Sequence, residues 1–147
     1  MASSPSIRIR QVHDYQFMVD FGSLLPELLV DEAVPIGQGE GPFPEQMLIA
    51  GVANCLCASF VFALGKYKQD AQGVAAEAHC AVERNAEGRL RISAIDVEIA
   101  LGTEASALDR LDKVLAQFER FCTVSESVKA GIPVAVSVRD NQGQRLK

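Results

Sequence analysis

Positive charge is scarce in this sequence and absent from a long part of it. The 147 residues carry 14 lysines and arginines against 19 aspartates and glutamates, so the net charge at pH 7 is −5. No lysine or arginine occurs from Gln11 to Gly65. Because a phosphate backbone is bound by a basic face, this balance argues against nucleic acid as a partner.

Other absences narrow the class of protein. Residues 1–10 lack the apolar core of a signal peptide, so we expect a cytoplasmic protein. Its few cysteines do not make a disulfide framework in a chain of this length, and free thiols are expected. No paired histidines or cysteines stand at ligand spacing, so we predict no metal and no cofactor. The length fits a single domain over residues 1–147.

The longest apolar run, residues 46–65, contains no charged residue. Its length alone would allow a transmembrane helix. Asn54, Ser59 and the many small residues argue against that interpretation, as does the lack of a basic cluster on the N-terminal side. We therefore predict no membrane span, but a buried central helix that begins at Pro44 and ends near Lys66.

Alternating patterns predict strands on both sides of this helix. Residues 6–12 and 15–21 alternate around a turn at His13-Asp14, which predicts a hairpin, with a short third strand at 28–31. A second hairpin is expected over 74–83 and 90–101. Its second strand changes phase near Ser93-Ala94, which predicts a β-bulge there.

The C-terminal third predicts two helices and a strand. Apolar residues at helical spacing indicate a helix over about 104–121 and a shorter one over 123–129. A last strand is expected at 132–138, followed by a frayed polar tail at 141–147. The whole order is an α+β pattern with mainly antiparallel pairing.

The four cysteines are the residues most suited to chemistry, because a thiolate is a strong nucleophile. Cys55 lies in the apolar helix, where burial disfavours the charged form, so an inert core residue is the plainer interpretation of it. Cys57 points away from Cys55 and forms no Cys-x-x-Cys redox pair with it. Cys80 is expected on the inward face of a strand. Cys122 follows the predicted helix of the C-terminal third.

Two segments resemble a known family. Residues 43–55, FPEQMLIAGVANC, are similar to the central-helix motif of the osmotically inducible protein C and organic hydroperoxide resistance protein family (OsmC/Ohr). Residues 121–125, FCTVS, and 132–136, IPVAV, resemble its Cys-Pro-Val-Ser segment and closing strand. The element order also matches, and the resemblance covers about residues 6–138.

The resemblance implies a fold and an activity. It implies an OsmC-like fold, with an antiparallel sheet packed on a long buried central helix in an intertwined homodimer. It also implies an antioxidant, stress-response oxidoreductase with peroxiredoxin-type activity on organic hydroperoxides. Cys55 would become a sulfenic acid, Cys122 would resolve it as a disulfide, and a lipoyl-type dithiol would reduce the disulfide. Glu45 matches the acidic residue that hydrogen-bonds an arginine beside the thiolate.

The sequence departs from the family at that arginine. Active members place it before the Pro-Glu motif, where this chain has acids and no cation, although Arg8 and Arg10 could replace it from the first strand. Ten residues of straight helix rise about 15 Å, so Glu45 meets Cys55 only if the helix is interrupted or the thiol belongs to the other subunit. A second hypothesis thus stays open: a non-catalytic dimer that responds to redox state or binds a small apolar ligand.

Overall fold

A computed structural model describes residues 2–22 and 24–147 of the chain. Its strands are β1 (Arg8–His13), β2 (Gln16–Asp20), β3 (Leu28–Val30), β4 (Val74–Arg84), β5 (Leu90–Leu101) and β6 (Val134–Arg139). Its α-helices are α1 (Pro44–Gly65), α2 (Leu111–Gln117) and α3 (Thr123–Val128), and two 3-10 turns are η1 (Ala105–Ala107) and η2 (Phe118–Phe121). The chain divides into two compact units, residues 1–48 and 49–147.

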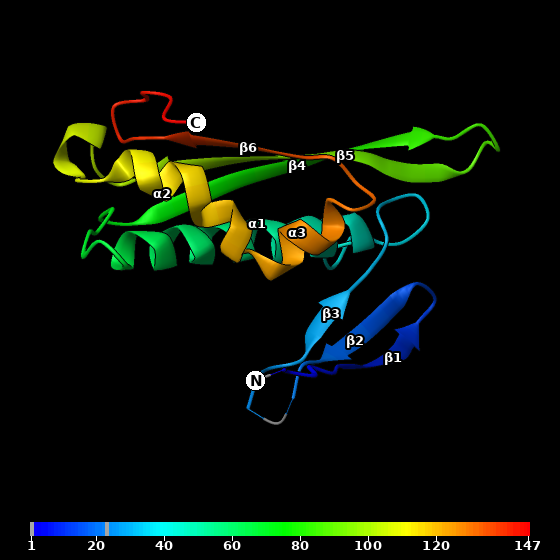
Figure 1. Cartoon of the computed structure of the whole chain (residues 1–147). Helices are drawn as coiled ribbons and strands as arrows, with labels where there is room; N and C mark the ends of the chain where they lie inside the picture. Colours follow the sequence, from blue (N-terminus) through cyan, green and yellow to red (C-terminus); the bar gives the residue numbers. More distant parts are fainter. Residues whose placement is uncertain (1, 23) are drawn as a thin grey trace. The chain divides into compact units, whose positions relative to one another are not determined.

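The N-terminal unit holds a three-stranded antiparallel sheet in the order β1-β2-β3 (Figure 1). The predicted hairpin and third strand are confirmed, although the turn falls one residue later, with Asp14 in a left-handed conformation. Asp31 follows β3 and is buried. Its carboxylate accepts hydrogen bonds from the backbone N–H groups of Glu32, Gln38 and Glu40 and so organises the loop that leads to α1.

The C-terminal unit holds the sheet β4-β5-β6. Ala81 pairs with Ala94 and Val82 with Ile92, so Ser93 is the extra residue of the predicted bulge, which is confirmed. β6 pairs with β5 in parallel, unlike the other strand pairs. The reason is the long connection through α2 and α3, which returns the chain to the end of the sheet from which β5 started (Figure 1).

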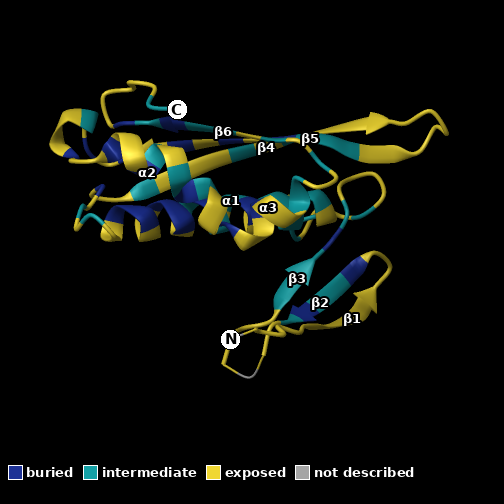
Figure 2. Cartoon of the chain, viewed as in Figure 1, coloured by how far each residue is buried: buried dark blue, intermediate teal, exposed yellow. Residues whose placement is uncertain are grey.

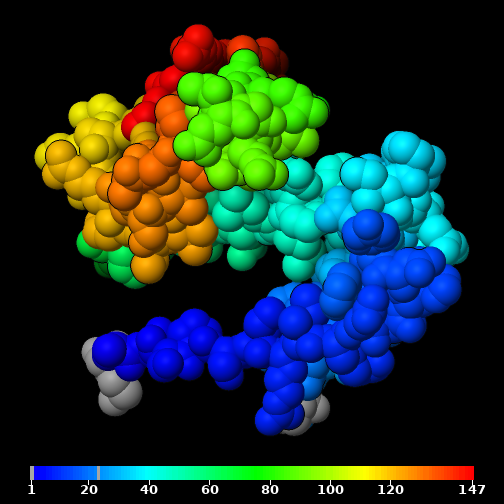
Figure 3. All heavy atoms as spheres, turned by 90° about the vertical axis from the view of Figure 1, so that its right-hand side faces the viewer, coloured from blue at the N-terminus to red at the C-terminus, as the bar shows by residue number. Residues whose placement is uncertain are grey.

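The predicted helix over 104–121 is wrong in its extent. Leu108 is extended and Arg110 is left-handed, with φ at 59°, so the chain turns before α2 begins. The frayed tail is also wrong. The N–H of Leu146 donates to the carbonyl of Val138 at 2.7 Å, and the ammonium group of Lys147 reaches back to α2. In the space-filling view the tail lies on the C-terminal unit (Figure 3).

The core of the C-terminal unit lies between α1 and the sheet. One face of α1 is buried, and Phe60 on that face meets the ring of Phe118 edge-on at 5.0 Å between centroids. The other face is open within one chain, with Phe62 and Val61 both more than half exposed (Figure 2). By length and composition α1 could cross a bilayer, but a helix with one face packed into its own sheet is typical of a soluble protein.

Candidate active site at two cysteines

Cys55 lies on α1 at the border between the buried and the exposed face. Successive residues of an α-helix are about 100° apart around its axis. Leu56 and Ser59, on one side of Cys55, are buried, while Ala58 and Phe62, on the other, are exposed. The thiol of Cys55 is accordingly half-buried. Its position makes it accessible both from the core of its own chain and from outside.

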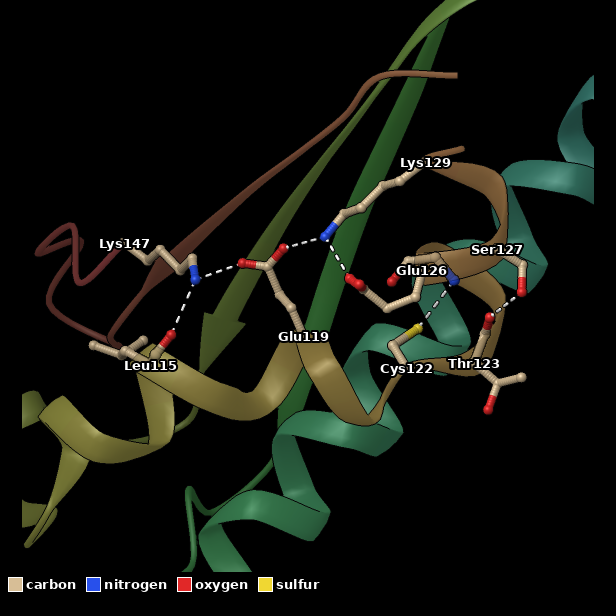
Figure 4. Close-up of polar contacts among 9 residues, drawn as sticks. Leu115, Glu119, Cys122, Thr123, Glu126, Ser127, Lys129 and Lys147 are labelled. Carbon is tan, nitrogen blue, oxygen red and sulfur yellow. Dashed lines mark hydrogen bonds and ion pairs between the residues drawn. The ribbon is translucent and has the colours of Figure 1, made fainter. Parts of the chain in front are cut away.

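Cys122 is fully buried and stands between η2 and α3. Its backbone is extended, with φ at −85° and ψ at 97°, and this break in helical structure turns the side chain inward. Its sulfur accepts a hydrogen bond from the backbone N–H of Ser125 at 3.3 Å, which caps α3 (Figure 4). The thiol is thus fixed by its own short helix.

The fold brings Cys55 and Cys122 together. Burial raises the pKa of the Cys122 thiol, and a hydrogen bond and the charge of Cys55 raise it further, while the hydroxyl and N–H of Ser125 act in the opposite direction. A thiol near enough to affect the pKa of another thiol is placed for thiol–disulfide chemistry. Burial also raises the pKa of Cys57, but Cys57 has no such partner among the described residues.

Cys55 opens into a pocket of about 390 Å³, lined also by Ala58, Ser59, Phe62 and Phe121. The rings of Phe62 and Phe121 meet edge-on at 5.2 Å, and the ammonium group of Lys66 lies 4.2 Å from the centroid of Phe121. The pocket is therefore apolar beside the sulfur, and the ammonium group of Lys66 lies over two of the rings that line it. Sequence reasoning missed Phe62, although its place two turns after Cys55 puts it on the same face.

No lysine or arginine among residues 2–22 and 24–147 forms a hydrogen bond with the sulfur of Cys55 or Cys122 within the chain. Of the two arginines proposed as substitutes, Arg10 is paired with Glu27 at 2.8 Å. Arg8 has no ion-pair partner in the described part of the chain. Both belong to the N-terminal unit.

Glu45 lies in the first turn of α1, and α1 runs without interruption from there past Cys55 (Figure 1). The rise of an α-helix places the two residues about 15 Å apart along the axis. The alternative of an interrupted helix is thereby excluded. Within one chain, the structure brings together Cys55 and Cys122, but it does not bring Glu45 to Cys55.

An ion-pair cluster surrounds Cys122 in sequence (Figure 4). The carboxylate of Glu119, in η2, accepts from the ammonium groups of Lys129 at 2.7 Å and Lys147 at 2.5 Å. Lys129 also pairs with Glu126 of α3 at 2.8 Å. Because Glu119 precedes Cys122 and Glu126 follows it, the cluster ties together the two segments that hold the thiol.

The N-terminal unit has an apolar pocket of its own, of about 450 Å³. Ile9 of β1, Tyr15 and Phe17 contribute to it from the hairpin, and Met47 from the start of α1. Ile9 and Tyr15 are more than half exposed. The sheet therefore leaves an apolar face uncovered in the single chain.

Comparisons with known proteins agree on one family. A family model described as OsmC-like protein matches residues 37–137. No curated protein matches the chain in sequence. Among solved structures, an OsmC-like protein of unknown function from Vibrio cholerae is 16% identical, with a TM-score of 0.77 over 93% of this chain and 99% of that one.

Two similar structures are named organic hydroperoxide resistance proteins. One, from Elizabethkingia anophelis, is 14% identical, with a TM-score of 0.75 over 96% of this chain and 100% of that one. The other, from Bacillus subtilis, is 18% identical, with a TM-score of 0.66 over 93% and 98%. At these identities the likeness establishes the fold.

Proposed function

Because the chain belongs to the OsmC-like protein family, we propose that it is a thiol-dependent peroxidase that reduces organic hydroperoxides. The observation that supports this proposal is that Cys55, far from Cys122 in sequence, lies near enough to raise the pKa of the Cys122 thiol. The names of the related structures support a stress-response and antioxidant role. Reduced thiols suit the cytoplasm.

The reaction proceeds in three steps. The thiolate of Cys55 attacks the terminal oxygen of the hydroperoxide, the O–O bond breaks, and the alkoxide leaves as an alcohol after taking a proton. Cys55 is thereby oxidised to a sulfenic acid. The sulfur of Cys122 attacks the sulfenic sulfur, forming the disulfide and releasing hydroxide, which takes up the thiol proton and becomes water. A lipoyl-type dithiol then reduces the disulfide and is itself oxidised.

The pocket beside Cys55 supports an organic substrate over hydrogen peroxide. Phe62 and Phe121 present apolar surface next to the sulfur. An alkyl or aryl group that covers these rings removes their surface from water, which favours binding. Hydrogen peroxide has no such group.

A homodimer is part of the proposal. The exposed face of α1, with Val61 and Phe62, and the uncovered face of the N-terminal hairpin are the kind of surface that a second copy covers. In such a dimer Glu45 would act on Cys55 of the partner subunit, since the unbroken α1 keeps it from Cys55 of its own chain.

The test uses purified, fully reduced protein and cumene hydroperoxide. Wild type should consume the peroxide and form a Cys55–Cys122 disulfide, detected by mass spectrometry. Cys55→Ser should abolish consumption, and Cys122→Ser should allow one turnover and leave Cys55 as sulfenic or higher oxides. Cys57→Ser is the matched control and should behave as wild type. A wild-type protein that forms no disulfide refutes the peroxidase.

A second candidate function is supported by the pocket of the N-terminal unit and by the missing family arginine. An apolar hollow of about 450 Å³ is in the size range of small-molecule sites. Without the peroxidase, the chain would be a non-catalytic dimer that is redox-responsive or binds a small apolar ligand. Repeated consumption of cumene hydroperoxide with an excess of dithiol distinguishes the two, because only the peroxidase turns over.

A further inference from the structure

Ser125 is a buried hydroxyl that lacks a normal hydrogen bond. Its side chain is fully buried in α3, and its Oγ has no partner among the described residues. Buried polar groups in folded proteins are almost always paired, so an unpaired one in a small helix calls for a reason. Burying a hydroxyl without a hydrogen-bond partner lowers the stability of the fold, because the group loses its hydrogen bonds to water.

The neighbouring serine of the same helix behaves in the ordinary way. The hydroxyl of Ser127 donates to the carbonyl of Thr123, four residues back, at 2.8 Å (Figure 4). This is the usual local bond of a serine in a helix. Ser125 makes no such bond, so its proton is available to another acceptor.

The acceptor next to Ser125 is the sulfur of Cys122. The backbone N–H of Ser125 already donates to this sulfur at 3.3 Å. The hydroxyl lies close enough to the thiol to lower its pKa, against the larger effect of burial. A neutral thiol is a weak acceptor of hydrogen bonds. A thiolate is a strong one.

We propose that Ser125 is a catalytic donor to the Cys122 thiolate, a role that rests on the proposed peroxidase. As the Cys122 thiol passes its proton to the oxygen that leaves Cys55, the hydroxyl and the N–H of Ser125 together bind the charged sulfur. The sulfur then forms the S–S bond with Cys55, the S–O bond of the sulfenic acid breaks, and the departing hydroxide takes up the proton and leaves as water. The buried hydroxyl is unpaired in the resting thiol and paired in the reacting thiolate.

Other groups near the sulfur do not supply this bond. Cys55, from α1, is the titratable group that interacts with Cys122, and it disfavours a second charge there. Glu119 of η2, Glu126 of α3 and Lys129 are engaged in their own ion pairs. Ser125 is therefore the donor available to the thiolate within the described chain.

The experiment compares Ser125→Ala with Ser127→Ala, which removes a hydroxyl from the same helix. The first measurement is a ¹³C NMR titration of Cys122 in protein that also carries Cys55→Ser and labelled cysteine. Ser125→Ala should lower the thiolate fraction at a given pH about tenfold or more, because a hydrogen bond to a charged group stabilises the charged form by about this factor. Ser127→Ala should leave the titration unchanged.

The second measurement follows resolution in a single turnover with cumene hydroperoxide. Ser125→Ala should prolong the Cys55 sulfenic acid, trapped with dimedone, by about tenfold, while its formation keeps the wild-type rate. Ser125→Gly, which lacks the same hydroxyl, replaces it if the alanine variant does not fold. Urea denaturation of each variant separates a loss of structure from a loss of the donor.

The outcomes separate the two proposals. If wild type forms no disulfide, the peroxidase is refuted, and the titration alone still decides the role of Ser125. If Ser125→Ala leaves both the titration and the sulfenic acid lifetime unchanged, Ser125 is no donor and the inference is overturned. A gain in the stability of Ser125→Ala without a change in either measurement also overturns it.

Discussion

Replacing Glu119 with glutamine should lower the free energy of unfolding by about 1–2 kcal/mol at neutral pH. Glu119 joins η2 to Lys129 and to Lys147, and Lys147 also donates to the carbonyl of Leu115 at 2.9 Å. Glutamine keeps the size and one oxygen acceptor but removes the charge. Among the described residues, one charged carboxylate, that of Glu126, would then be left for Lys129, and none for Lys147.

The magnitude follows from the burial of the pairs. Hydrogen bonds to charged groups contribute about 1.5–3 kcal/mol each where they are shielded. Here the side chain of Glu119 is 20% exposed and those of Lys129 and Lys147 are 29% and 33% exposed, so water screens part of the interaction. The remaining amide oxygen recovers a further part of it. About 1–2 kcal/mol is what these reductions leave.

The pH dependence has a definite sign. Burial alone would raise the pKa of Glu119, but the hydrogen bonds and charges of Lys129 and Lys147 outweigh it, and the pKa of the folded protein is lower than the ordinary value. The ionised carboxylate therefore stabilises the fold fully above the unfolded pKa of about 4.3. This stability is lost as the pH falls through the lower folded pKa.

Urea denaturation at one fixed protein concentration measures the effect, since assembly would otherwise alter apparent stability. The difference between wild type and Glu119→Gln should be largest at pH 7 and should shrink once the pH is below about 4. Glu126→Gln is the matched control. It should lower the free energy of unfolding by less than about 0.5 kcal/mol, because Glu126 is 46% exposed and Lys129 retains its ion pair with Glu119. A Glu119→Gln effect that is no larger than the control, or that persists unchanged in acid, refutes the reasoning.

Three further predictions test the packing of the core, the homodimer and the cation near Cys55. Phe60→Ala should lower the free energy of unfolding by about 3–5 kcal/mol in urea, because Phe60 and Phe118 are fully buried against each other; a loss below about 1 kcal/mol would contradict this packing. Wild type should sediment at twice the chain mass and Phe62→Glu as a monomer, since this ring is exposed in the single chain; a monomeric wild type would remove the dimer. Arg8→Gln should slow the first turnover with cumene hydroperoxide by about tenfold or more, whereas Arg10→Gln, whose side chain is already paired, should change it less. Equal rates for both arginine variants would show that neither is the cation.

Local patterns predicted the strands and the central helix because these elements depend on short-range alternation and on composition. The phase shift in residues 90–101 even located the bulge at Ser93. The helix over 104–121 was overpredicted because its apolar spacing continues through a place where the backbone turns. Arg110 adopts a left-handed conformation there, which helical periodicity does not reveal.

The candidate site was predictable in part. Both cysteines were proposed from their motifs, but their proximity depends on how the segment after α2 folds back on α1. Nothing in the sequence indicated a role for Ser125 beyond its place in the FCTVS segment, since only the packed structure shows that its hydroxyl is unpaired. Phe62 and Lys66 were overlooked because the uncharged run suggested a helix buried on all sides.

The edge position of Cys55 explains why one residue can serve both halves of the proposed reaction. One residue along α1, at Leu56, a thiol would be sealed in the core, where no hydroperoxide could reach it. Three residues along, at Ala58, it would face outward and away from Cys122. Only near the border of the two faces does a sulfur meet both the apolar pocket and the buried partner thiol. The position of α1 relative to η2, where Phe60 packs against Phe118 in the core, therefore determines whether the two cysteines can work as a pair.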